Sequence, residues 1–292
     1  MKKVLITGAN SYIGISFEKY LQQWPEEYHV DTVDMIDGTW REKSFAGYDA
    51  VYHVAGIAHS DTGKVSDERK ELYYKINTDL AIETAMKAKK DGVKQFVFMS
   101  SASVYGDSAP IGKTKMITRD TPVSPTSVYG DSKVKAEQGI IPLHDENFNV
   151  VILRPPMIYG HGSKGNYPVL SKLARKLPVF PMVDNRRSML YIGNLVEFVR
   201  LMVDNNEQGI FWPQNKEYSH TAEMVRQIAE IHGKKIMLLR GFNWSLKLLS
   251  HCTGLVNKAF GSLCYEQELS RYLQEYCITN LQDSLKETEQ TK

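Results

Sequence analysis

The chain of 292 residues contains little cysteine and no long apolar segment. Cys252, Cys264 and Cys277 are odd in number and widely spaced, which excludes a disulfide framework and a C-x-x-C metal site. We expect free thiols in a reducing cytoplasm. No apolar run approaches the roughly 20 residues needed to cross a bilayer, because VVILRPPMIY is interrupted by Arg154 and two prolines. No membrane span is therefore expected.

The chain also lacks a strong charge of one sign, since 36 basic and 34 acidic side chains leave a net charge of +2. This balance provides no field that would attract nucleic acid or an anionic membrane. His53 and His59 do not form an H-E-x-x-H or comparable ligand pattern, so no metal site is expected. A content of 42% hydrophobic and 24% charged residues is typical of a globular protein with a real core.

Short apolar runs, each followed by polar or small residues, alternate with helical patterns. The runs at 3–7, 29–33, 50–54, 95–99 and 149–153 predict strands, and the patterns at 12–23, 67–90 and 128–141 predict helices. This alternation predicts an α/β fold, a Rossmann-type doubly wound parallel sheet covered by helices on both faces. Ligands should bind at the carboxyl ends of the strands.

The pattern divides the chain into two regions. Residues 1–154, joined by parts of 188–215, are expected to form the dinucleotide-binding domain. Residues 155–292 predict a smaller, partly interleaved substrate region, with helices near 193–203, 221–232 and 242–255. The segment 35–48 is short for a helix, a strand and a second helix, so one βα unit is expected to be missing or abbreviated, and Asp37 has no clear place.

The first predicted strand leads into the turn TGANSYIG, residues 7–14, and then into a helix. Backbone N–H groups and the helix dipole can hold a pyrophosphate there. Ser11 occupies the middle glycine position of a G-x-x-G-x-x-G pattern, so its Cβ takes space where the chain passes closest to phosphate. Its hydroxyl can compensate with a hydrogen bond. The residues expected to contact the cofactor are Gly8, Asn10, Ser11, Tyr12, Ile13 and Gly14.

Asp34 ends the second predicted strand, 26 residues after Gly8. A carboxylate at this point can accept both hydroxyls of an adenosine ribose and repel a 2′-phosphate. It therefore favours NAD over NADP, although Arg41 and Lys43 are close enough in sequence to keep NADP open. The alternative for Asp34 is a solvated strand end.

Tyr129 and Lys133 lie four residues apart in SVYGDSK, residues 127–133. With 16 tyrosines and 25 lysines, roughly one such pair arises by chance, so the spacing alone does not establish a site. On a helix, however, the pair shares one face and can point into the mouth of the sheet.

Acid-base work by Tyr129 near pH 7 requires its pKa to fall by about three units, or roughly 4 kcal/mol. A unit positive charge about 4 Å away supplies a comparable energy at an effective dielectric constant of about 20. We therefore expect Lys133 to be nearly sufficient, with help from the positive charge of an oxidised nicotinamide. Ser101, at the end of the fourth strand, is the expected second partner of the reacting oxygen, with Ser100 and Ser103 as alternatives.

The motifs together resemble the extended short-chain dehydrogenase/reductase family, the NAD-dependent nucleotide-sugar epimerases and dehydratases, over nearly the whole chain. They are TGANSYIG, Asp34, HVAGIA at 53–58, Asn77, SSASVYG at 100–106, SVYGDSK and RPPMIYG at 154–160. The resemblance implies Tyr129 as base, Lys133 as the group that holds both the tyrosine and the nicotinamide ribose, and Ser101 on the substrate oxygen. It also implies cofactor contacts at Val54, Ala55, Gly56, Ala58, Asn77, Met99 and Pro155.

Departures from the family patterns narrow the reaction. The 4,6-dehydratases carry an Asp-Glu pair where this chain has Ala102 and Ser103, and the similar decarboxylases carry a glutamate at the position of Ser103. Epimerisation or simple carbonyl reduction remains. Arg187, in DNRRSMLYIGNL at 184–195, falls on the family arginine that grips a nucleotide diphosphate, with Arg186 as its exposed neighbour.

Met157 stands where the galactose epimerases carry an asparagine that touches the substrate. With NRRS and the GSKGNY loop at 162–167, this resembles the bacterial surface-polysaccharide branch, which includes UDP-N-acetylhexosamine 4-epimerases and UDP-N-acetylquinovosamine 4-reductases. The expected substrate contacts are Ser101, Ser103, Met157, Asn166 and Arg187.

The leading expectation is an NAD-dependent C4 epimerase of a UDP-hexose or UDP-N-acetylhexosamine that forms a transient 4-keto sugar. The close alternative is a 4-ketoreductase that consumes NADH or NADPH on a UDP-4-keto-6-deoxy-N-acetylhexosamine. A second alternative is a non-catalytic NAD-sensing regulator, which the intact Ser-Tyr-Lys set disfavours. The expected partner is a nucleotide sugar, and the resemblance also suggests a homodimer through the helix that carries the Tyr-Lys pair.

Overall fold

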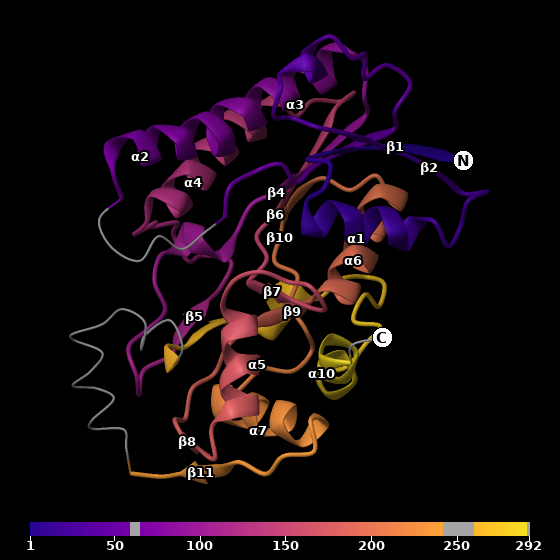
Figure 1. Cartoon of the computed structure of the whole chain (residues 1–292). Coiled ribbons are helices and arrows are strands. Elements are labelled where there is room, and N and C mark those ends of the chain that lie inside the picture. Colours follow the sequence, from indigo (N-terminus) through magenta and orange to yellow (C-terminus); the bar gives the residue numbers. More distant parts are fainter. Residues whose placement is uncertain (59–64, 242–259, 291–292) are drawn as a thin grey trace.

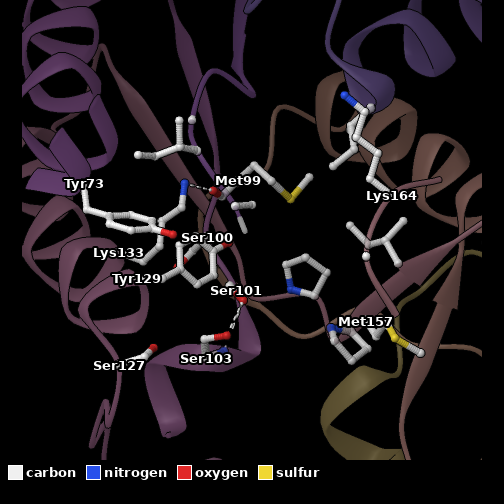
Figure 2. Close-up of a pocket in the computed structure, with 18 of the residues that line it drawn as sticks. Tyr73, Met99, Ser100, Ser101, Ser103, Ser127, Tyr129, Lys133, Met157 and Lys164 are labelled. Atoms are coloured by element: carbon white, nitrogen blue, oxygen red, sulfur yellow. Dashed lines mark hydrogen bonds between the residues drawn. The ribbon is translucent and has the colours of Figure 1, made fainter. Parts of the chain in front are cut away.

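A six-stranded parallel sheet forms the centre of the computed structural model, which describes residues 1–58, 65–241 and 260–290. The strand order is β10-β6-β4-β3-β1-β2. The strands are β1 (Lys2–Thr7), β2 (Tyr28–Val33), β3 (Ala50–His53), β4 (Gln95–Met99), β6 (Asn149–Leu153) and β10 (Gly209–Phe211). Residues that follow β3, β4 and β6 line one cavity (Figure 2).

The five predicted strands and the doubly wound fold are confirmed, whereas β10, only three residues long, was not predicted as a strand. Between β2 and β3 the chain forms only a 3₁₀ turn, Thr39–Arg41, so the expected abbreviation of one βα unit is also confirmed. Asp37 has a local role there, because its carboxylate accepts hydrogen bonds from the backbone N–H of Thr39 at 3.0 Å and from its hydroxyl at 2.7 Å.

Helices cover both faces of the sheet (Figure 1). On one face lie α2 (Asp67–Tyr73), α3 (Leu80–Lys90) and α4 (Val128–Ile140), and on the other lie α1 (Tyr12–Leu21) and α6 (Ile192–Asp204). Consecutive strand residues face opposite cores: Val4 and Ile6 pack in the core that includes α1 and α6, whereas Leu5 packs in the core that includes α3 and α4. Burial on both faces explains why the strands are continuous apolar runs.

The predicted helix at 67–90 is continuous in the structure but contains a π-helical turn, Tyr74–Asp79, between α2 and α3. Beyond the turn, Ala81, Ala85 and Ala88 are fully buried against the sheet. Their small side chains allow a close approach of the helix to the strands. The π turn lets the two halves of this helix present different faces.

Outside the large sheet and its covering helices, the described residues form three two-stranded parallel sheets and three α-helices beside the carboxyl edge of the large sheet. The strand pairs are β7 (Met157–Tyr159) with β9 (Met189–Tyr191), β8 (Val179–Pro181) with β11 (Met237–Leu239), and β5 (Lys115–Ile117) with β12 (Leu263–Tyr265). The helices are α5 (Asn166–Lys176), α7 (Thr221–Ile231) and α10 (Leu281–Glu289). The predicted helix at 242–255, Cys252 and His59 lie outside the described residues. No helix of the described ranges could cross a membrane.

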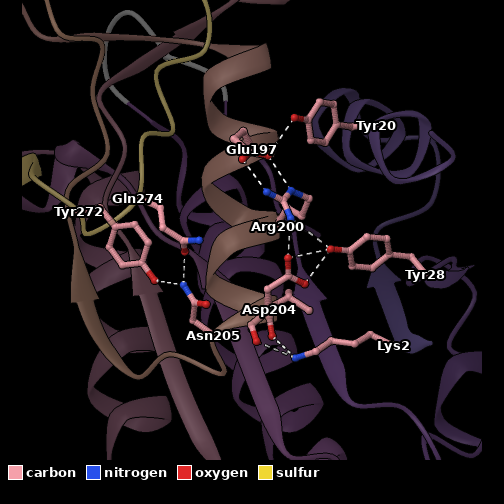
Figure 3. Close-up of polar contacts among 10 residues, drawn as sticks. Lys2, Tyr20, Tyr28, Glu197, Arg200, Asp204, Asn205, Tyr272 and Gln274 are labelled. Atoms are coloured by element: carbon pink, nitrogen blue, oxygen red, sulfur yellow. Dashed lines mark hydrogen bonds and ion pairs between the residues drawn. The ribbon is translucent and has the colours of Figure 1, made fainter. Parts of the chain in front are cut away.

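Arg200 of α6 joins this helix to the N-terminal elements (Figure 3). Its guanidinium donates two hydrogen bonds of 2.7 Å to Glu197 and one of 2.6 Å to Asp204. The Tyr28 hydroxyl of β2 donates to Asp204 at 2.7 Å, and the Tyr20 hydroxyl of α1 donates to Glu197 at 2.9 Å. The cluster therefore ties a helix from the second half of the chain to elements from the first.

Replacement of this guanidinium should weaken the fold. Arg200→Met keeps an apolar stem but leaves the carboxylates of Glu197 and Asp204 without their cation. Because the Arg200 side chain is 22% exposed, we expect the unfolding free energy to fall by about 2 kcal/mol, less than the 3–5 kcal/mol typical of a fully buried pair. Urea unfolding followed by circular dichroism measures this change.

Arg226 of α7 provides a matched control. It pairs with Glu223 and Glu230 at the same helical spacings, but its side chain is 41% exposed, whereas the Arg200 cluster also includes Tyr20 of α1 and Tyr28 of β2. Arg226→Met should cost less than about 1 kcal/mol. Equal losses for the two variants would contradict the role of Arg200 as a tie between the halves of the chain.

Candidate active site

A cavity of about 450 Å³ opens at the carboxyl ends of β3, β4 and β6. Ligands of doubly wound folds bind at this edge of the sheet. The structure brings many of the predicted site residues together in its lining: Ile13, Val54, Gly56, Ala58, Met99, Ser101, Ser103, Tyr129, Lys133, Pro155, Met157 and Asn166.

Tyr129 and Lys133 lie on successive turns at the start of α4 and both face this cavity (Figure 2). The helix begins where the Ser127 hydroxyl accepts a hydrogen bond from the backbone N–H of Gly130 at 3.1 Å. The Lys133 ammonium donates a 2.8 Å hydrogen bond to the Met99 carbonyl at the end of β4. The predicted common direction of the two side chains is therefore confirmed.

The prediction that Lys133 nearly suffices to lower the pKa of Tyr129 is wrong for the protein without a bound cofactor. Burial raises the pKa of Tyr129 above its usual value, and the lowering effect of the Ser101 hydroxyl does not offset it. Burial also lowers the pKa of Lys133 to about 8, and its ammonium is bonded to Met99 rather than to the phenol. The spacing of Tyr129 and Lys133 carries no information on the desolvation cost of the phenolate. Burial therefore opposes ionisation of this phenol in the protein alone.

The serines after β4 have different surroundings. The Ser101 hydroxyl accepts a hydrogen bond from the Ser103 backbone N–H at 3.1 Å and donates to the Ser103 hydroxyl at 3.2 Å. The Ser100 hydroxyl instead donates to the Glu137 carboxylate at 2.5 Å. Ser101 and Ser103 therefore form a local pair at the cavity wall, while the hydrogen bond of Ser100 is directed into the buried core.

The loop after β3 is held by Asn77, which lies in the π turn. Its side-chain oxygen accepts from the Ile57 backbone N–H at 2.9 Å, and its side-chain nitrogen donates to the Ile57 carbonyl and the Ser132 hydroxyl at 3.1 Å each. Asn77 is fully buried and is not among the residues that line the cavity. It thus positions the 54–58 loop against α4.

The turn between β1 and α1 brings the backbone close to the loop after β3. Gly8 has φ +96°, and a Cβ at this position would lie 2.8 Å from the Ala55 backbone nitrogen. Only glycine meets both demands. The Ser11 hydroxyl caps α1 by accepting a 3.1 Å hydrogen bond from the Gly14 N–H, so it is already engaged within the protein.

Asn10 and Tyr12, also in this turn, were predicted as cofactor contacts. Asn10 adopts a left-handed backbone conformation, φ 68°, which asparagine tolerates. The Tyr12 hydroxyl is buried and has no hydrogen-bond partner among the described residues. A Cβ at Gly160 would lie only 2.5 Å from this hydroxyl, so the side chain packs against the segment after β7.

Asp34 is exposed at the end of β2 and accepts a 2.9 Å hydrogen bond from the Ile36 backbone N–H. The neighbouring backbone carbonyl of Val33 accepts from Gly8 and Ala9 at 3.0 and 3.1 Å, which places the carboxylate beside the β1–α1 turn. Arg41, the cation that kept NADP open, donates two 2.5 Å hydrogen bonds to Glu83 on α3.

Arg187 is not brought into the cavity that Tyr129 and Lys133 line. Its backbone exchanges hydrogen bonds with Ser219 at 2.9 and 2.8 Å, and burial lowers the pKa of its guanidinium. Arg186 is exposed, as predicted, and lies over the Tyr218 ring at 5.5 Å. The nucleotide-diphosphate role of Arg187 stays a prediction.

Several lining residues were not predicted, among them Tyr73, Asp107 and Lys164. The Tyr73 ring lies 6.3 Å from the Tyr129 ring, centroid to centroid, and Lys164 lies on the opposite wall of the cavity (Figure 2). Lys164 belongs to the GSKGNY loop, in which Asn166 was predicted as a substrate contact. Tyr73 was not predicted, because the packing of α2 against α4 that brings it to the cavity leaves no periodic pattern in the sequence.

His53 takes part in a buried hydrogen bond, and the two described cysteines form no disulfide. The His53 ring is bonded to the Thr7 hydroxyl at 2.7 Å, and burial lowers its pKa to about 3. Cys264 and Cys277 are free, in line with the expectation of thiols. The described part of the chain contains no group of three or more His, Cys, Asp or Glu side chains arranged to hold a metal ion.

The sequence of this chain is similar to those of known proteins. Residues 4–212 match the NAD dependent epimerase/dehydratase family. The chain is 30% identical to UDP-glucose 4-epimerase of Vibrio cholerae over 94% of its length and 87% of the relative. It is 25% identical to N-acetyl-alpha-D-glucosaminyl-diphospho-ditrans,octacis-undecaprenol 4-epimerase of Escherichia coli O157:H7 over 97% of its length and 88% of the relative.

Solved structures share the fold at lower identity. UDP-glucuronic acid 4-epimerase from Bacillus cereus, in complex with NAD, superimposes with a TM-score of 0.72 at 19% identity, over 98% of this chain and 97% of that one. A dTDP-4-dehydrorhamnose reductase from Clostridium acetobutylicum gives 0.66 at 22% identity, over 82% and 83%. With the match at residues 4–212 covering well over half of its length, the chain belongs to the NAD dependent epimerase/dehydratase family.

Proposed function

We propose that the protein binds NAD and epimerises C4 of a UDP-hexose or UDP-N-acetylhexosamine. The observation that carries this proposal is the meeting of Ser101, Tyr129 and Lys133 in one cavity with the 54–58 loop. The epimerase relatives from Vibrio cholerae and Escherichia coli support a C4 reaction on a nucleotide-linked or diphosphate-linked sugar.

The residues at the sheet edge fit a dinucleotide. The close approach of Gly8 to Ala55 brings the turn at the start of α1 against the loop after β3, and backbone N–H groups at a helix start favour a diphosphate. Asp34 is exposed beside this turn and is suited to the adenosine ribose hydroxyls. Since Glu83 holds Arg41, the nearby cation is already neutralised, which favours NAD over NADP.

In the proposed mechanism, Tyr129 takes and returns the proton of the C4 hydroxyl, and Ser101 donates a hydrogen bond to the same oxygen. Bound NAD would supply the hydride acceptor and donor and a positive charge in the site. Burial raises the pKa of Tyr129, which opposes its ionisation. The charge of Lys133 lowers the cost of forming the phenolate, and the charge of the cofactor would lower it further.

One observation favours a second candidate, a 4-ketoreductase. Met157, which lines the cavity, replaces the asparagine that the resemblance associates with the galactose epimerases. A 4-ketoreductase would use the same Ser-Tyr-Lys set without rotation of the keto sugar. A non-catalytic regulator is disfavoured by the placement of all three groups at one cavity wall. Homodimerisation and a cytoplasmic location stay predictions.

Loss of the phenol hydroxyl should abolish turnover and spare the cofactor. Tyr129→Phe removes the proton acceptor, so we expect kcat to fall at least about 100-fold, the range of a lost general acid-base group. NAD affinity, measured by calorimetry, should change less than threefold.

Tyr272→Phe is the matched control, because its hydroxyl bonds Asn205 and Glu207, remote from the cavity, and its loss should leave kcat unchanged. Retained activity in Tyr129→Phe would remove the proposed mechanism.

The fate of the cofactor separates the two candidate reactions. Incubation with a panel of UDP-hexoses and their 4-keto derivatives, with and without NADH, is followed by mass spectrometry and NMR. An epimerase should copurify with NAD and form the epimer without net cofactor consumption, whereas a reductase should convert only the keto sugar and consume NADH in equal amount.

A side chain at Gly8 should prevent cofactor binding. In Gly8→Ala the Cβ meets the Ala55 backbone at 2.8 Å, and the residue must hold φ +96°. We expect NAD affinity to fall at least about 100-fold, since the turn must open and its N–H groups move away from the diphosphate.

Gly92→Ala is the control for backbone conformation alone. Gly92 has φ +81° with no atom within 4 Å of an added Cβ, so this variant should lose about 1 kcal/mol of stability and bind NAD normally. Normal NAD binding by folded Gly8→Ala would show that the turn does not hold the cofactor.

A further inference from the structure

A buried ion pair lies behind the cavity wall, between Arg154 after β6 and Glu137 on α4. The guanidinium donates to the two carboxylate oxygens at 3.1 and 2.5 Å. The Arg154 and Glu137 side chains are only 9% and 3% exposed. Burial of two charges is costly, and apolar residues of similar size often stabilise a core equally well. The pair therefore calls for an explanation other than stability.

Arg154 is fixed from the side opposite Glu137. Its guanidinium donates to the Tyr105 hydroxyl at 2.8 Å, and the same hydroxyl accepts from the Trp212 indole at 2.6 Å. The Arg154 carbonyl accepts from the Tyr265 hydroxyl at 2.5 Å. These contacts leave the guanidinium one orientation, toward Glu137.

Glu137 in turn contacts both elements that carry the catalytic set. On its own helix it follows Lys133 by one turn, so the two side chains lie on the same face. Across the core it accepts the 2.5 Å hydrogen bond from Ser100. Ser100 stands between Met99, whose carbonyl binds the Lys133 ammonium, and Ser101 at the cavity wall. The carboxylate thus bridges α4 to the end of β4.

The groups around Lys133 include one carboxylate. Tyr129 precedes it on α4, Tyr73 comes from α2, and His53 and the Phe98 ring come from β3 and β4. Burial lowers the pKa of Lys133 to about 8, and the charge of Glu137 opposes that fall. The other neighbours named here are neutral or aromatic, and the guanidinium bonded to Glu137 is cationic, so none of them stabilises an ammonium to the same degree.

We propose that Glu137, held in place by Arg154, is a positioning residue that keeps the Lys133 ammonium charged and fastens the end of β4 to which that ammonium binds. The proposal rests on the proposed function, since Lys133 must be cationic to assist Tyr129. It concerns the charge state of a residue of this chain, however, and can be tested without substrate or cofactor.

NMR titration of protein labelled with ¹³C-lysine reads the charge directly. A midpoint near 8 lies well below the reference pKa of about 10.4 for a lysine side chain, so the Lys133 signal should stand apart. Its absence from Lys133→Met assigns it. In Glu137→Gln, which keeps the side-chain size and removes the charge, the midpoint should fall by about one pH unit.

A second variant covers the case in which Glu137→Gln fails to fold with Arg154 left unpaired. Glu137→Gln with Arg154→Met leaves no unpaired buried charge and should also lower the Lys133 midpoint, by less than Glu137→Gln alone because the cation of Arg154 is removed as well. Ser284→Ala is the control, because it also removes a buried hydroxyl bond, between Ser284 and Tyr159 at 2.6 Å, far from Lys133. Its Lys133 midpoint should match the wild type.

The outcomes separate this proposal from the proposed function. An unchanged or raised Lys133 midpoint in folded Glu137 variants would overturn the positioning role and leave the Tyr129 mechanism intact. A downward shift in a protein that shows no sugar turnover would uphold the positioning role and remove the proposed reaction. NAD affinity gives a second readout. Because Lys133 loses its charge as pH rises, NAD affinity should fall with rising pH. In the Glu137 variants this fall should begin at a lower pH than in the wild type.

Discussion

The hydrogen bond from the Lys133 ammonium to the Met99 carbonyl is the contact on which the site depends. It joins the second turn of α4 to the end of β4, so that Tyr129, one turn earlier, faces the serines that follow the strand. Burial of a cation is costly unless hydrogen bonds and an opposite charge compensate for the lost water. The parallel sheet supplies the first at a strand end, and the helix supplies the second one turn away.

The same edge of the sheet is reached by segments far apart in the sequence because parallel strands release their carboxyl ends on one side. The β1–α1 turn, the loop after β3 and the serines after β4 meet there, and each is held by side-chain hydrogen bonds to backbone N–H groups. Asn77 shows this most clearly, since it bonds both the 54–58 loop and α4 without reaching the cavity itself. Asn77 was predicted as a cofactor contact, and in the structure it holds the 54–58 loop in place.

Five strands of the large sheet and the helices that cover it could be predicted from the sequence because apolar runs and helical periods are local signals, whereas lining residues such as Val54 and Met157 were implied by the family resemblance. The pKa of Tyr129 could not, because desolvation depends on everything packed around the phenol. Nor could Tyr73 or the Glu137–Arg154 pair, since each is brought to the site by tertiary contacts that leave no periodic pattern. β10 was missed for a similar reason: three residues give no period to recognise.

The π turn between α2 and α3 has a consequence for how this segment tolerates change in length. An added residue rotates all later side chains of an α-helix by about 100°. Tyr73, before the turn, is therefore free to face the cavity while the alanine row after it stays against the sheet. Deleting a single residue from this stretch would restore a regular α-helix. Either Tyr73 would then turn away from the cavity or the alanine row would turn away from the sheet, so the length of this segment links the cavity wall to the core.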